Sequence, residues 1–179
     1  MNALSQEDYD RCRFPIMFGG RLIDLGAPRP EDINIAALHT RLALIRRFSG
    51  DPRALTVSAH SRAVWSLALA AHAPDGVVRW CLCHDMHEAI IGDIPGPLKH
   101  FLAQHTDALI HLEIALDRAI CGAMSIPEPT AEERTRVRFF DKLAETMEWV
   151  HVLKRPAARW NAPYTEHHLA TFRSAVGVP

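Results

Sequence analysis

Apolar residues recur every three or four positions along most of this chain, a spacing that places them on one face of a helix. Each stripe ends close to a glycine or a proline, which are common helix breakers. The stripes comprise Ile35, Leu38, Leu42 and Ile45; Val64, Leu67, Ala68 and Ala71; Leu109, Leu112, Leu116 and Ile120; and Val137, Phe140, Ala144, Met147 and Val150. The pattern contains no alternation of strands with helices. It therefore predicts a mostly α fold, with a helical core over about 33–155 and a tail helix over about 165–176.

One stretch near the start of the chain departs from the helical pattern. Residues 14–18 and 21–25 flank Gly19 and Gly20. A Gly-Gly pair suits a two-residue turn with positive φ, so we expect a small N-terminal β-hairpin over about 14–25. At 179 residues the chain is long enough for one well-buried core and short for two. We therefore expect a single domain over 1–179.

Composition and charge limit the partners of this protein. Twenty Lys and Arg against 21 Asp and Glu give a net charge of -1, which argues against a broad surface for nucleic-acid polymers or anionic membranes. Residues 1–13 lack the apolar segment of a signal peptide, and the longest apolar stretch, about 63–73, is far too short to span a membrane. We expect a cytoplasmic protein whose four cysteines remain thiols.

Imidazole and carboxylate side chains gather in the run 83–97. A helix through this run would place His84 and Glu88 on one face, one turn apart, with Asp85 close enough to share it. A glycine and two prolines follow, and they should end the helix and hold Asp93 near the same site. The run therefore predicts a pair of ligands with a nearby acid–base group.

Two further helical segments supply matching donors. His60 lies in the first turn of a helix that Ser58 can cap, and Asp141 interrupts an apolar stripe. An aspartate among core positions is costly unless it is paired or ligates an ion. Together with His84 and Asp85, these residues form a candidate metal site on three helices, the middle one expected to run unbroken from residue 75 to 91. Such a set suits one borderline divalent ion such as Mn, Co, Fe, Ni or Zn, with Mg also considered.

Two cysteines beside the motif suggest a zinc site as an alternative. Cys81 and Cys83 are two residues apart, so on a helix their side chains point about 200° away from each other. They can hardly ligate one ion together, and we expect thiols buried in the core.

The motif run resembles the HD-domain phosphohydrolases. From His84 to Lys99 it is similar to the bacterial 5'-deoxynucleotidase branch, in which His-Asp-x-x-Glu precedes Gly-Asp-hydrophobic-Pro-x-Pro-hydrophobic-Lys. The chain also resembles short phage deoxynucleoside triphosphohydrolases, and the likeness covers roughly residues 20–153. It implies an HD-type helical bundle, a divalent metal ion, a homo-oligomer (a dimer or larger), and cleavage of the 5' phosphoester of deoxynucleotides.

The resemblance also implies roles around the scissile ester. Glu88 would orient the attacking water or protonate the leaving 5'-oxygen, and Asp93 would hydrogen-bond the 3'-hydroxyl of a deoxyribose. Arg47 would contact phosphate, unless the match slips to Arg46, and Phe48 would pack near the sugar or base.

Other residues near the motif have less specific expectations. Lys99 is a second candidate for phosphate, although it could equally be solvated. Pro95 would shape the pocket near the base. Glu145, one turn after Asp141, is a candidate to hold a metal ligand or a water.

Three alternatives remain open on the sequence. A triphosphohydrolase would release tripolyphosphate, whereas a deoxynucleotidase releases orthophosphate. A non-catalytic nucleotide-binding module could keep the same fold and ion. A two-metal phosphodiesterase would need His105 or His111 close to the ion.

Overall fold

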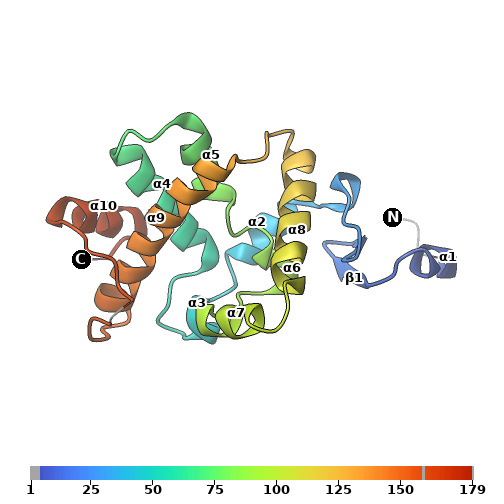
Figure 1. Ribbon diagram of the computed structural model, residues 1–179, viewed down its shortest axis with the longest axis horizontal. Helices are drawn as coiled ribbons and strands as arrows, with labels where there is room; N and C mark the ends of the chain where they lie inside the picture. The colour runs from blue at the N-terminus through green and yellow to red at the C-terminus, as the bar shows by residue number, and fades with distance from the viewer. Residues whose placement is uncertain (1–4, 159, 179) are drawn as a thin grey trace.

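The computed structural model describes residues 5–158 and 160–178 and shows a mostly helical protein (Figure 1), as the apolar stripes predict. At its centre α4 (Val57–Ala70) packs against α5 (Asp75–Cys83) and α9 (Ala131–Met147). The tail helix α10 (Glu166–Val176) lies against α4 and α9. In the described part of the chain, no helix is long and apolar enough to cross a membrane.

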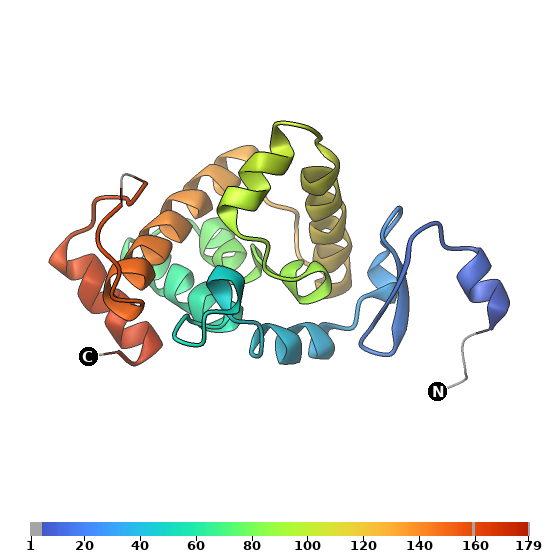
Figure 2. The same ribbon diagram turned by 90° about the horizontal axis from the view of Figure 1, so that it is seen from below.

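Shorter elements surround this centre, and helix α8 closes one side of it (Figures 1 and 2). The remaining elements are α1 (Gln6–Asp10), β1 (Pro15–Phe18), β2 (Arg21–Asp24), the 3₁₀ turn η1 (Pro30–Asp32), α2 (Ile35–Leu42), α3 (Arg47–Gly50), α6 (Glu88–Ile91), α7 (Gly96–Ala103), α8 (Ala108–Met124) and the π-helical turn η2 (Glu148–Val152).

The predicted hairpin is confirmed. Strands β1 and β2 pair antiparallel, with Phe18 opposite Arg21 at the turn. Gly19 and Gly20 adopt φ values of 57° and 76°, the left-handed region that this turn needs. Helix α1 lies beyond the hairpin, at the opposite end of the molecule from the C-terminus (Figure 2). No candidate site residue comes from this N-terminal end.

The stripes predicted from sequence form one hydrophobic core. Leu38, Leu67, Leu116 and Met147 come from four different helices and are almost wholly inaccessible to solvent. Phe172 of α10 joins the same cluster and is completely buried. Burial of a side chain of this size contributes roughly 1.5–3 kcal/mol relative to exposure. The helices that carry the candidate donors are thus held together by ordinary apolar packing.

The expected unbroken helix from 75 to 91 is wrong. Helix α5 ends at Cys83, residues 84–87 form a tight turn, and α6 begins at Glu88. His84 Nδ1 lies 2.9 Å from the carbonyl oxygen of Cys81, an acceptor that the amide of Asp85 would use in a continuous helix. The amide of Glu88 instead bonds the carbonyl of Asp85 at 3.1 Å, a three-residue step. The side chain of His84 therefore competes with the helix that carries it.

Other boundaries also differ from expectation. The first helix ends at Leu42, not near residue 50, and Phe48 and Ser49 adopt left-handed conformations with φ of 53° and 59°. The apolar stripe from Leu109 to Ile120 lies on α8, and the separate helix α7 precedes it. Helix α4 is capped by Thr56, whose side chain accepts from the amide of Ala59, and not by Ser58.

Candidate metal centre

Three helices bring His60, His84 and Asp141 together. His60 lies in the first turn of α4, His84 follows the last residue of α5, and Asp141 is on α9. The Nε2 atom of His60 is 2.9 Å from Asp141 Oδ1, and the Nε2 atom of His84 is 3.8 Å from the same oxygen. One donor atom from each residue lies within 4.8 Å of the other two. This is a size that one divalent ion can span.

The second ring nitrogen of each histidine lies near an oxygen atom of a neighbouring residue. Because His84 Nδ1 donates to the Cys81 carbonyl, its Nε2 atom has a free lone pair that faces the cluster. That Nε2 atom is buried and has no hydrogen-bond partner. His60 is completely buried, and its Nδ1 atom lies 3.6 Å from Glu148 Oε2. The buried and unpartnered Nε2 atom of His84, next to the carboxylate of Asp141, fits a ligand of a divalent ion.

Asp85 lies beside these donors, and one oxygen of its carboxylate faces two neighbours. Its Oδ2 atom is 3.2 Å from His84 Nε2 and 3.5 Å from Arg47 Nη1. The structure therefore brings three of the four predicted ligands into one group, whereas Asp85 lies beside His84 on the side that faces Arg47 and is not part of that group.

Arg47 is neither exposed nor solvated. Its Nε atom lies 3.1 Å from Glu148 Oε2, and the other oxygen of Glu148 accepts from the Leu55 amide at 2.7 Å. Glu148 is completely inaccessible to solvent. Burial works against the charged guanidinium, but Glu148 and Asp85 outweigh it and raise the pKa of Arg47 above its usual value. The guanidinium of Arg47 therefore places a permanent positive charge next to Asp85 and Glu148 at the candidate centre.

Glu148, and not Glu145, is the carboxylate that lies beside a candidate ligand, with its Oε2 atom 3.6 Å from His60 Nδ1. Glu145 instead pairs with Lys142, at 2.6 Å between Nζ and Oε2, on the outer side of α9. Glu148 follows Asp141 by seven residues, which is two turns of helix, so the two lie on one face. That spacing was a readable signal for Glu148.

The ionisation of the cluster follows from these contacts. Burial disfavours the charged form of Asp141, but the hydrogen bond with His60 and the nearby His84 imidazole lower its pKa well below the usual value. The neighbouring carboxylates of Asp85 and Asp141 raise the pKa of His84 well above its usual value of 6.5, although burial works against the charged imidazole. Protons and a divalent ion would therefore compete for the same nitrogen atoms.

Glu88 is buried, with only 3% of its surface exposed. Burial and the nearby Asp85 raise the pKa of Glu88 well above its usual value. Asp93 also has a raised pKa, chiefly from burial, and its Oδ2 atom has no hydrogen-bond partner. Pro95 is half-buried directly before α7. A buried carboxyl whose pKa is raised above its usual value suits acid–base work.

Helix α8 contributes charged groups that the sequence analysis missed. His87 Nδ1 is 2.9 Å from Asp117 Oδ1, and Lys99 Nζ is 2.9 Å from Glu113 Oε1. Glu113 and Asp117 are four residues apart, immediately after Leu112 and Leu116 of the apolar stripe. Acidic residues at the edge of a core stripe, one turn apart, were the signal for this second layer.

A cavity of about 530 Å³ opens beside the candidate donors, between α8 and α9. His84, Asp85 and Asp141 line one part of it, and Lys99, Glu113, Arg134 and Arg138 line another. Arg47, Phe48, Asp93 and Pro95 are not among its lining residues. Phe48 instead packs against Trp149, with ring centroids 5.7 Å apart.

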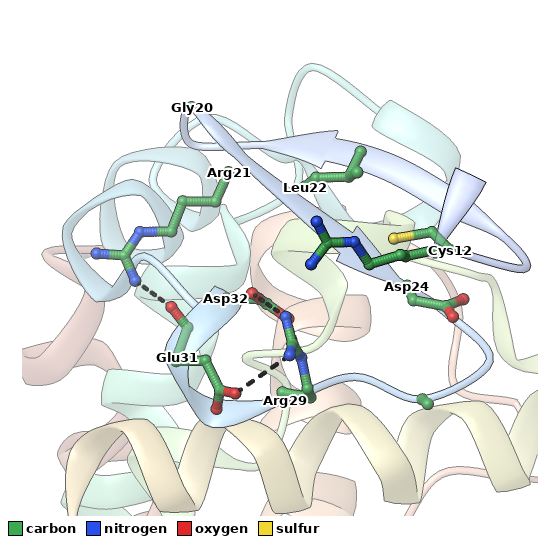
Figure 3. Close-up of a pocket in the computed structure, with 10 residues that line it drawn as sticks. Cys12, Gly20, Arg21, Leu22, Asp24, Arg29, Glu31 and Asp32 are labelled. Atoms are coloured by element: carbon green, nitrogen blue, oxygen red, sulfur yellow. Dashed lines mark hydrogen bonds and ion pairs between the residues drawn. The ribbon is translucent and has the colours of Figure 1, made fainter. Parts of the chain in front are cut away.

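A separate cavity of about 690 Å³ lies at the hairpin, and its charged groups are engaged with one another (Figure 3). Arg21 donates to the carbonyl oxygen of Glu31 at 2.7 Å, and Arg29 pairs with Asp32 at 2.8 Å. The Arg21 contact joins the hairpin to η1, and the Arg29–Asp32 pair lies within η1 and the residue before it. They give this hollow a structural role.

The remaining candidates do not join the cluster. His105 and His111 are exposed, and neither belongs to a metal-binding group among the described residues. Cys81 and Cys83 are free thiols in the core, as expected. Burial raises the pKa of Cys81 to about 12, so the neutral thiol persists.

No protein-family model matches the chain. The chain is similar to an uncharacterized protein of Rhodobacter capsulatus, with 32% identity over 113 residues that cover 56% of this chain and 57% of that protein. The chain thus spans little more than half the length of this relative. The fold and the site define a mostly helical protein with a partly buried cluster of two histidines and an aspartate.

Proposed function

We propose that this protein is a metal-dependent phosphohydrolase of the HD type that cleaves the 5' phosphoester of deoxynucleotides. The observation that carries the proposal is the convergence of His60, His84 and Asp141 from three helices, with Glu88 buried close by. Asp85 completes the set of four ligands that the motif implies. A bound divalent ion would supply positive charge that polarises a phosphoryl oxygen.

The protein's own groups have separate tasks in this proposal. Glu88, with its raised pKa, gives a proton to the leaving 5'-oxygen or takes one from the attacking water. Asp93 has an unpartnered carboxylate oxygen that can accept a hydrogen bond from a sugar hydroxyl. Arg47 neutralises Asp85 and Glu148 from behind, so its contribution to phosphate binding is through the field of its charge.

Product analysis tests the proposal. The purified protein, loaded with Mn or Co, is incubated separately with each dNMP and each dNTP. Orthophosphate from a dNMP is the expected product, and Glu88→Gln should lower the rate roughly 10²- to 10⁴-fold. Glu132→Gln is the matched control, because Glu132 is an exposed carboxylate that pairs with Arg136 on its own helix.

Other outcomes would redirect or refute the proposal. Tripolyphosphate from a dNTP would identify a triphosphohydrolase, a reading that the cations Lys99, Arg134 and Arg138 along the cavity also suit. If no substrate is turned over but a deoxynucleotide still binds, the protein is a nucleotide-binding module, and the catalytic assignment of Glu88 is wrong.

A further inference from the structure

The ammonium group of Lys99 lies between a buried and a half-buried glutamate next to the candidate metal centre. Its Nζ atom is 2.9 Å from Glu113 Oε1 and 3.7 Å from Glu88 Oε1. Glu88 comes from α6, Lys99 from α7 and Glu113 from α8. Burial alone would lower the pKa of Lys99, but the two glutamates outweigh it, so the pKa is raised and the charge is kept.

A buried imidazole faces the same position. His87 is 5% exposed, and Asp117 binds its Nδ1 atom at 2.9 Å. This contact leaves Nε2 directed toward Glu113 Oε1, 3.6 Å away, without a hydrogen-bond partner. The Oε2 atom of Glu88 is also buried and unpartnered. The Lys99 ammonium therefore contacts Glu113 and Glu88, and His87 lies next to Glu113. With the lysine in place, the donor atoms of these three residues do not form a group that one ion can span.

The spacing of these atoms suits an ion better than it suits a direct contact. Two ligand atoms 3.6 Å apart, as His87 Nε2 and Glu113 Oε1 are, can share one divalent ion at about 2.1 Å from each. The arrangement of His87 also matches a histidine prepared for a metal, because its other nitrogen is held by a carboxylate. The ammonium group of Lys99 supplies positive charge to both Glu113 and Glu88.

We propose that Lys99 occupies the place of a second divalent cation and so keeps the centre a one-ion site. The inference rests on the proposed metal centre and adds its stoichiometry. It also bears on the two-metal phosphodiesterase alternative, since His105 and His111 are exposed and a second ion would need Glu88, Glu113 and His87. Removal of the lysine should open that second site, because the buried Glu88 and the half-buried Glu113 would then lack a counter-charge.

Metal stoichiometry tests this inference without any activity assay. Metal-free wild type, Lys99→Arg, Lys99→Ala and the double variant Lys99→Ala/Glu113→Gln are dialysed against Mn²⁺, and bound Mn per chain is measured by atomic emission. We expect one ion in wild type and in Lys99→Arg, two in Lys99→Ala, and one in the double variant. Circular dichroism checks the fold of each, and Lys99→Ser takes the place of Lys99→Ala if that variant does not fold.

The outcomes separate the two proposals. One ion in both wild type and Lys99→Ala would overturn the inference and leave the metal centre intact. Two ions in wild type would overturn it as well, because the lysine would then exclude nothing. Two ions in the double variant would refute the assignment of Glu113 as a donor. No ion in wild type, with none in Lys99→Ala, would instead overturn the metal centre itself.

Discussion

Substitution of Glu148 by glutamine is a sharp test of how the candidate centre is supported. The amide oxygen of Gln can still accept from the Leu55 amide, but the negative charge 3.1 Å from Arg47 Nε is removed. Loss of one partner of a buried ion pair costs roughly 3–5 kcal/mol. Asp85 remains 3.5 Å from the guanidinium, so the lower end, about 3 kcal/mol, applies. For a chain of this size that amounts to a melting temperature lower by roughly 6–12 °C.

The assay is thermal unfolding of metal-free protein followed by circular dichroism, with urea unfolding as a second measure. Glu145→Gln is the matched control, because its partner Lys142 is partly exposed and lies on the same helix. Such a pair is worth about 0–1 kcal/mol, so this variant should melt within about 4 °C of wild type. A Glu148→Gln protein that melts within the same interval would refute the view that Glu148 compensates a buried Arg47.

Three further predictions concern the metal, pH and the hairpin. Mn²⁺ at one hundred times its Kd should stabilise wild type by about 2.7 kcal/mol, and Asp141→Asn should lose this shift in differential scanning fluorimetry. The pKa values of His60 and His84 are raised above 6.5, so their protonation stabilises the metal-free fold below that value, an effect lost as pH rises through the folded pKa. Mn²⁺ must displace those protons, so the Mn-induced rise in melting temperature should be larger at pH 8 than at pH 6, and equal shifts would contradict the ligand assignment. Gly19→Ala should lower stability by about 1–3 kcal/mol, because φ is 57° and a Cβ atom would lie 2.5 Å from that of Ala37; Gly96→Ala, with open space around it, should be nearly neutral in urea unfolding.

Helix identity was predictable from sequence because burial of an apolar stripe dominates the energetics. Leu38, Leu67, Leu116 and Met147 occupy the core as the 3.6-residue period requires. Helix ends were less predictable, because they depend on single hydrogen bonds. The break at His84 arises from its own side chain bonding to the Cys81 carbonyl, a choice that periodicity cannot register.

The candidate donors were predictable for a different reason. His60, His84, Asp85 and Asp141 stand out because polar side chains at core positions need partners. The supporting residues Glu148, Glu113 and Asp117 were not found, since a carboxylate on a helix is usually solvated. Their importance depends on which helices become neighbours, and that is a tertiary property.

The convergence of donors from distant parts of the chain has a consequence for folding order. His60 and Asp141 are separated by 81 positions along the chain, yet their side chains are 2.9 Å apart. Closing so long a loop is an entropic barrier that local helix formation does not overcome, and contacts of this kind slow folding. An ion held by these residues would act as a removable cross-link between α4 and α9. Binding of the ion during refolding would report when α4 and α9 first come into contact.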